Sequence, residues 1–103
     1  MDFDKYQKVA FETAMESSKN IFYMTMGLCG EAGEVANKIK KVMRDGKSPD
    51  IEDLKKELGD CLWYVAGMAT VLGIALDDIA DANLIKLHSR KARGVIEGSG
   101  DNR

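Results

Sequence analysis

The sequence predicts an all-α fold, because apolar residues recur every three or four positions through each long segment, as they do in amphipathic helices. No segment of convincing length alternates apolar and polar residues, so no strand is predicted. With 103 residues the chain is long enough for one compact domain and too short for two. We therefore expect a protomer resembling a four-helix bundle, with helices at about residues 4–18, 21–44, 50–72 and 77–91.

Capping residues delimit the first two predicted helices. Asp2 or Asp4 can cap the first, and Asn20 can cap the second. The stretch from Asp45 to Pro49, which contains a glycine and the single proline, is the clearest break in the chain. The second helix is therefore expected to end near residue 44.

The last two helices also have start and stop signals. Ser48 followed by Pro49 predicts a helix start, and the acidic residues that follow suit the positive end of a helix dipole. Gly73 separates this helix from the last one. The glycines after the last helix predict a flexible, basic tail over residues 93–103, following a domain over residues 1–92.

The composition is that of a soluble globular protein, with 45% hydrophobic and 31% charged residues. A net charge of −2 gives no reason to expect a nucleic-acid or membrane partner, and no apolar run approaches the length of a membrane span. The two cysteines lack CxxC spacing and are interpreted as small buried residues in a reducing cytoplasm. Basic residues dominate from residue 86 onward, whereas the rest is acidic, which suits a ligand that carries both a metal and phosphates.

Two acidic pairs at i,i+3 spacing lie on successive predicted helices: Glu31 with Glu34, and Glu57 with Asp60. Both pairs border the apolar stripe of their helix on the same side, so antiparallel packing would bring four carboxylates together. Two such charges about 5 Å apart repel by roughly 3 kcal/mol at an effective dielectric of about 20. A hard cation bound by oxygen ligands, Mg²⁺ or also Mn²⁺, would remove this penalty. The alternative is a solvated helix face, where acidic pairs are common.

Other polar residues are candidates for substrate contacts. Asn83, Lys86 and Arg90 share one face of the last helix, either as a phosphate clamp or as an ordinary polar face. Lys38 is angularly close to the acidic pairs, although it also suits a solvated face. Tyr64 lies on the acidic side, whereas Trp63 is predicted to point away from it.

These motifs resemble those of the MazG-like nucleoside triphosphate pyrophosphohydrolases, in the all-α NTP pyrophosphatase group that also holds the dimeric dUTPases. The resemblance covers nearly the whole chain. Its most specific parts are Gly30-Glu31-Ala32-Gly33-Glu34, Glu57-Leu58-Gly59-Asp60, Asn83-Leu84-Ile85-Lys86-Leu87 and the tail from Ser89 to Arg103. The family often has Glu-Glu-x-x-Glu in the first motif, and Gly30 takes the place of the first Glu here.

The resemblance implies that the four acidic residues bind Mg²⁺ and that Asn83 and Lys86 hold substrate phosphates. It also implies assembly through helix packing into dimers, or into tetramers made of two dimers, with sites shared between chains. The expected reaction is metal-dependent hydrolysis of a (deoxy)nucleoside triphosphate to the monophosphate and pyrophosphate. The catalytic candidates are Glu34, which is the first choice for the base, Glu31 and Lys86. The substrate-binding candidates are Lys38, Tyr64, Asn83, Lys86, Arg90 and Arg93. The alternative is a non-catalytic dimeric helical module that binds a nucleotide or a protein partner.

Overall fold

The computed structural model describes residues 1–103 and contains four α-helices and no strand. The helices are α1 (Phe3–Phe11), α2 (Ile21–Asp45), α3 (Ile51–Val71) and α4 (Leu76–Ala92), with a short 3₁₀ helix at Glu16–Ser18 between α1 and α2. The predicted all-α class and its four helices are confirmed.

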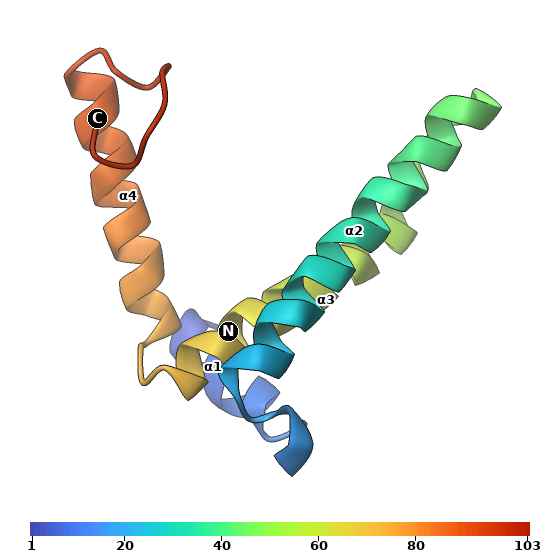
Figure 1. The fold of residues 1–103 in the computed structure, drawn as a ribbon, viewed down its shortest axis with the longest axis horizontal. Coiled ribbons are helices and arrows are strands. Elements are labelled where there is room, and N and C mark those ends of the chain that lie inside the picture. The colour runs from blue at the N-terminus through green and yellow to red at the C-terminus, as the bar shows by residue number, and fades with distance from the viewer.

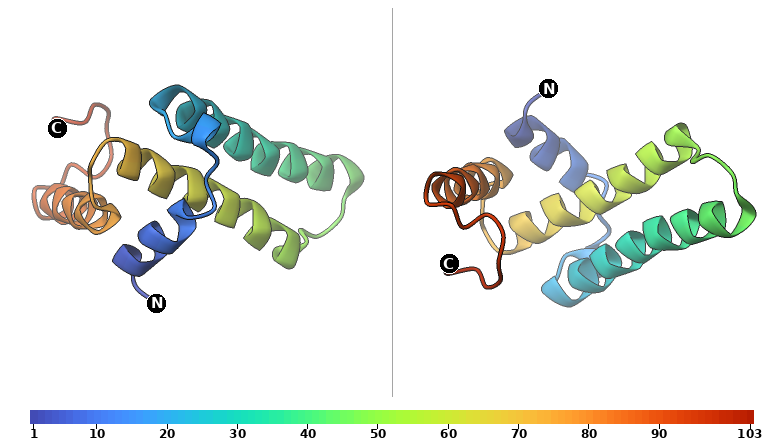
Figure 2. Two further views of the ribbon diagram at one scale, coloured as in Figure 1. Left: turned by 90° about the horizontal axis from the view of Figure 1, so that it is seen from below. Right: turned by 90° about the horizontal axis from the view of Figure 1, so that it is seen from above.

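Helices α2 and α3 form an antiparallel hairpin, seen side by side in both views of Figure 2. The chain leaves α2 at Gly46, whose φ of 63° lies in the left-handed region that glycine adopts without strain. Met24 of α2 is fully buried, and a Cβ added at Gly67 of α3 would lie 2.7 Å from its sulfur. The absence of a side chain at Gly67 therefore lets the two helices approach closely.

Three helix starts are capped by side chains. Asp2 accepts a hydrogen bond from the Lys5 amide at 2.8 Å, and Asn20 accepts one from the Tyr23 amide at 2.8 Å, as predicted. Helix α3 starts later than the Ser48–Pro49 signal indicates, because Asp50 caps it by accepting from the Asp53 amide at 3.2 Å.

Helix α1 is shorter than predicted, since it ends at Phe11 and the chain turns before the 3₁₀ helix. The prediction of one helix over residues 4–18 was wrong here. The indole N–H of Trp63 on α3 donates to the Ala10 carbonyl at 3.2 Å and to Thr13 Oγ1 at 2.9 Å. This tertiary contact occupies a carbonyl at the last turn of α1 and fixes the end of the helix against α3.

Helix α4 diverges from the α2–α3 hairpin, so the two form the arms of a V in Figure 1. The axes of α3 and α4 are bent by 105°, and α4 makes no contact with α2. Gln7 of α1 fixes the bend, because its side chain donates to Thr70 Oγ1 and the Ile74 carbonyl and accepts from the Leu76 amide at 2.7 Å. One chain alone therefore does not close a compact four-helix bundle.

The protomer leaves much apolar surface uncovered. Only seven of its 103 residues are buried, and its radius of gyration is 16.3 Å, against about 13 Å for a compact domain of this length. The most exposed apolar side chains on the helices are those of Phe22, Met26, Met43, Ile51 and Ile85. Both cysteines are free, and Cys29 is exposed, so the interpretation of both as buried was wrong. No single helix is long and apolar enough to cross a membrane, and only the bent pair α3–α4 meets that test of length and composition.

Gly27 lets the Tyr64 ring lie directly on α2, because a Cβ at this position would overlap the ring. We expect Gly27→Ala to lower the free energy of unfolding by about 1–3 kcal/mol through overpacking. Gly33→Ala is the matched control, since no atom lies within 4 Å of its added Cβ. That variant should gain up to about 1 kcal/mol from helix propensity. Urea unfolding followed by circular dichroism at one protein concentration measures both values, and equal shifts would contradict this account of Gly27.

Candidate functional site

Three carboxylates converge across the α2–α3 hairpin. One oxygen from each of Glu31, Glu57 and Asp60 lies within 4.8 Å of the others. Glu31 comes from α2 and the other two from α3, as the matched positions of the acidic pairs predict. Glu31 and Glu57 are half-buried and Asp60 is exposed, so the cluster lies at the edge of the hairpin core and opens to solvent.

Glu34, the fourth predicted member, lies outside this cluster and is exposed. It is still close enough for its charge to raise the pKa of Glu31. Three of the four predicted metal ligands are thus brought together, and Glu34 stands next to them with its carboxylate free.

The electrostatics of the cluster are those of crowded negative charge. The pKa of Glu31 is raised by partial desolvation first and then by the charges of Asp60 and Glu57. Desolvation also raises the pKa of Tyr64 and of Tyr6 on α1, and the charge of Asp60 adds to both shifts. The charge of Asp60 thus acts on Tyr6, a residue of α1 that the sequence did not indicate for the site.

Lys38 of α2 binds two carboxylates of α3. Its Nζ lies 2.7 Å from Asp53 Oδ2 and 3.0 Å from Glu57 Oε1, and these contacts raise the pKa of the lysine. The other Glu57 oxygen, Oε2, is buried and has no hydrogen-bond partner. A buried carboxylate oxygen without a partner is costly. Together with the two nearby carboxylates, this oxygen fits a site for a divalent cation with oxygen ligands.

A hollow of about 290 Å³ opens beside the cluster and is lined by Glu31, Asp60, Trp63 and Tyr64. The two aromatic rings meet edge to face, with centroids 5.0 Å apart and an interplanar angle of 85°. Tyr64 lies on the acidic side, as predicted. The prediction that Trp63 points away was wrong, because its hydrogen bonds to α1 hold the ring at the wall of this hollow.

The candidate phosphate-binding residues of α4 lie apart from the acidic cluster. Asn83 and Lys86 line a separate hollow with Ile79 and Ala82. Because α4 makes no contact with α2, these residues do not join Glu31 within one chain. The structure therefore divides the predicted site between two arms of the protomer.

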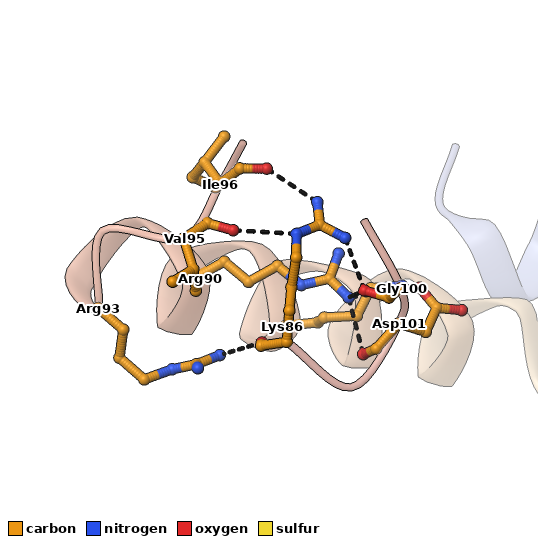
Figure 3. A network of polar contacts seen from close by, with 8 residues as sticks. Lys86, Arg90, Arg93, Val95, Ile96, Gly100 and Asp101 are labelled. Atoms are coloured by element: carbon orange, nitrogen blue, oxygen red, sulfur yellow. Dashed lines mark hydrogen bonds and ion pairs between the residues drawn. The ribbon is translucent and has the colours of Figure 1, made fainter. Parts of the chain in front are cut away.

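Arg90 holds the C-terminal segment, residues 93–103, against α4 (Figure 3). Arg90 is only 5% exposed, and its Nη2 donates to the Asp101 carbonyl at 2.8 Å. The Asp101 carboxylate lies 3.3 Å from both Lys86 Nζ and Arg90 Nη2, and these two cations lower its pKa. Arg90, predicted to bind phosphate, is thus engaged with the chain itself.

Arginines at both ends of this segment complete the network in Figure 3. Arg93 donates to Ser89 Oγ and to the Arg103 carbonyl, and the Arg103 side chain donates to the carbonyls of Val95, Ile96 and Gly100. Arg93 therefore also has partners within the chain. The domain boundary at residue 92 and the flexibility of residues 93–103 stay predictions.

Removing the negative charge of Glu31 should stabilise the metal-free protein, because its neighbours repel that charge. A carboxyl whose pKa is raised in the folded state destabilises the fold at neutral pH, and this penalty disappears as the pH falls below both pKa values. We therefore expect Glu31→Gln to raise the melting temperature of the metal-free protein at pH 7. At one concentration, Mg²⁺ should raise the melting temperature of the wild type more than that of the variant. Scanning calorimetry with and without Mg²⁺ tests both effects, and a destabilised metal-free Glu31→Gln would contradict this account.

Comparison with known proteins gives a match to one family over most of the chain. The family model described as MazG nucleotide pyrophosphohydrolase domain matches residues 21–95, which include all of α2, α3 and α4. The chain is also similar to the Gene 37 protein of Mycobacterium phage L5, with 48% identity over an alignment of 114 positions that covers all of both chains. No solved structure matches.

Proposed function

The chain belongs to the MazG nucleotide pyrophosphohydrolase family, and from this premise we propose that it hydrolyses (deoxy)nucleoside triphosphates to the nucleoside monophosphate and pyrophosphate. The observation that carries the proposal is the convergence of Glu31, Glu57 and Asp60 from two helices within 4.8 Å. Because nucleoside triphosphates are intracellular metabolites, we place this activity in the cytoplasm.

We propose Glu31, Glu57 and Asp60 as ligands of Mg²⁺, with Mn²⁺ as a substitute, and Glu34, which stands beside them, as the fourth. The buried, unpartnered Glu57 Oε2 supports this assignment, because a cation would supply the partner that the protein does not. When bound, the cation neutralises charge on the carboxylates and on the substrate phosphates.

The chain's own residues would handle the proton. In the proposed reaction a water oxygen bonds to the α-phosphorus, and the bond from that phosphorus to the α,β-bridging oxygen breaks. Glu34 is our candidate for the base that takes the proton of the water, because it stands beside the cluster and remains exposed. Glu31, a member of the cluster, is the second candidate.

The hollow beside the cluster is a candidate for the nucleoside. Its wall combines Trp63 and Tyr64 with the carboxylates of Glu31 and Asp60. An aromatic wall next to phosphate-handling groups suits a base or sugar attached to a triphosphate. We propose Tyr64 as a substrate contact on this basis.

We propose that the protein works as a homodimer or homotetramer in which α4 of one copy completes the site of another. The V shape sets α4 apart from α2, and apolar side chains of α2 and α4 are exposed. Both features support this assembly, because a second copy would cover these apolar side chains. Asn83 and Lys86 would then reach the phosphates from the second copy, with Lys86 stabilising charge on the leaving pyrophosphate. Arg90 and Arg93 would contribute only if the C-terminal segment releases them.

A pyrophosphate-release assay with mixed deoxynucleoside triphosphates, with and without Mg²⁺, tests the function. We expect equimolar monophosphate and pyrophosphate, with Mg²⁺ required. Release of single inorganic phosphate would contradict cleavage at the α-phosphorus. Nucleotide binding with no turnover in Mg²⁺ or Mn²⁺ would favour the alternative of a non-catalytic binding module.

A further inference from the structure

Lys38 and Glu57 form a partly shielded ion pair at the edge of the acidic cluster. The side chain of Lys38 is 29% exposed and that of Glu57 is 15% exposed, so water screens this pair less than it screens a surface pair. Asp53, one helical turn before Glu57, binds the same ammonium at 2.7 Å. Two carboxylates of α3 therefore hold the ammonium of Lys38.

The two oxygens of Glu57 have different surroundings. Oε1 accepts the ammonium of Lys38 at 3.0 Å, whereas Oε2 is buried and has no partner. Since Glu57 also offers an oxygen to the cluster with Glu31 and Asp60, the lysine leaves Oε2 as the oxygen available to a cation.

We propose that Lys38 is a positioning residue that restricts Glu57 to a single free oxygen. This inference rests on the proposed function. A glutamate with one free oxygen occupies one position around a divalent cation and leaves others for phosphate oxygens and water. Lys38 was predicted to bind substrate, but its ammonium already has two carboxylate partners within the chain.

Two physical effects follow from removing the ammonium, and they act in the same direction on cation binding. A positive charge that repels the cation is lost, and both oxygens of Glu57 become free to bind it. The cation should then bind more tightly. Turnover should fall, because a glutamate that takes two positions leaves fewer for the substrate.

Other roles for Lys38 predict different results. Loss of the positive charge beside Glu57 would tighten cation binding in every one of these roles, so kcat and the melting temperature decide between them. A lysine that only stabilises the hairpin would, when replaced, lower the melting temperature and leave kcat at saturating Mn²⁺ unchanged. A lysine that contacts the substrate would raise KM and leave kcat at saturating Mn²⁺ nearly unchanged. Tighter cation binding combined with a lower kcat at saturating Mn²⁺ belongs to the positioning role alone.

The test uses the full chain as wild type, Lys38→Met and Lys38→Arg, with Lys40→Met as the control. Lys40 is an exposed lysine on the same helix. Mn²⁺ affinity is measured by calorimetric titration without nucleotide, followed by kcat and KM for pyrophosphate release. We expect Lys38→Met to bind Mn²⁺ about three- to tenfold more tightly and to lose at least about tenfold in kcat. Lys38→Arg should stay close to wild type, because the guanidinium can still bind both carboxylates, and Lys40→Met should be unchanged.

Unchanged or weaker Mn²⁺ binding by Lys38→Met would overturn the inference. If that variant does not fold, Lys38→Gln replaces it with the same expectation, because its shorter neutral side chain cannot bridge both carboxylates. Wild-type protein without pyrophosphate release would refute the proposed function, while the Mn²⁺ titrations would still show whether Lys38 weakens cation binding. If the wild type is active and Lys38→Met binds Mn²⁺ less tightly or keeps the wild-type kcat, the positioning role alone is refuted.

Discussion

Asp60→Asn is expected to lower kcat for pyrophosphate release by at least about a hundredfold. Replacing even a residue that only hydrogen-bonds to a metal ligand lowers metal affinity or activity by about 10- to 100-fold. The side chain belongs to the three-carboxylate cluster and is exposed, so the substitution removes charge without opening a cavity. The helical circular dichroism signal should therefore be preserved. Steady-state kinetics at saturating Mg²⁺ measure the loss.

Glu52→Gln is the matched control for this prediction. Glu52 is an exposed acid in the first turn of the same helix and lies outside the cluster. Its variant should keep wild-type kcat. A fully active Asp60→Asn protein would remove the acidic cluster from the mechanism, and equal losses in both variants would point to a general effect of charge.

Restoration of activity by mixing two inactive variants is the second large effect that we expect. Asp60→Asn damages the hairpin arm of the site and Lys86→Ala damages the α4 arm, which makes no contact with α2 in the same chain. If α4 acts across a dimer, each mixed dimer keeps one intact site. Refolding equal amounts together should then recover about a quarter of the wild-type activity, because about half of randomly formed dimers are mixed and each has one working site out of two.

A mixture of Asp60→Asn with Glu57→Gln is the control, since both changes damage the hairpin arm and no intact site can form. This mixture should stay inactive. Failure of Asp60→Asn and Lys86→Ala to restore activity, with mixed dimers demonstrated by differently tagged chains, would contradict a site shared between copies.

The helices could be predicted largely from local sequence, because their caps and apolar periodicity depend on residues close in the chain. Asp2 and Asn20 cap as expected, and the last helix differs from its prediction by one residue at each end. The end of α1 could not be predicted, because the Trp63 indole that fixes it comes from α3. The direction of α4 likewise depends on Gln7, a residue nearly seventy positions away from the turn that it holds.

In the candidate site, too, some features followed from local spacing and others did not. The i,i+3 spacing of the acidic pairs was enough to predict that Glu31, Glu57 and Asp60 converge, because both pairs border the apolar stripes that pack together. The contact of Lys38 with Asp53 was missed, although Asp53 and Glu57 stand at i,i+4 on one helix face and could have indicated it. Trp63 stands at i+3 from Asp60, so helical spacing already places its ring beside the cluster, and the prediction that it points away overlooked this.

Titration of the nucleotide-free protein with Mn²⁺ tests most directly whether carboxylates from two helices form one cation site. The wild type should bind Mn²⁺ saturably, and Glu31→Gln on α2 and Glu57→Gln on α3 should each weaken that binding by at least about tenfold. Wild-type affinity in both variants would mean that the cluster holds no cation, and the proposed mechanism would be wrong.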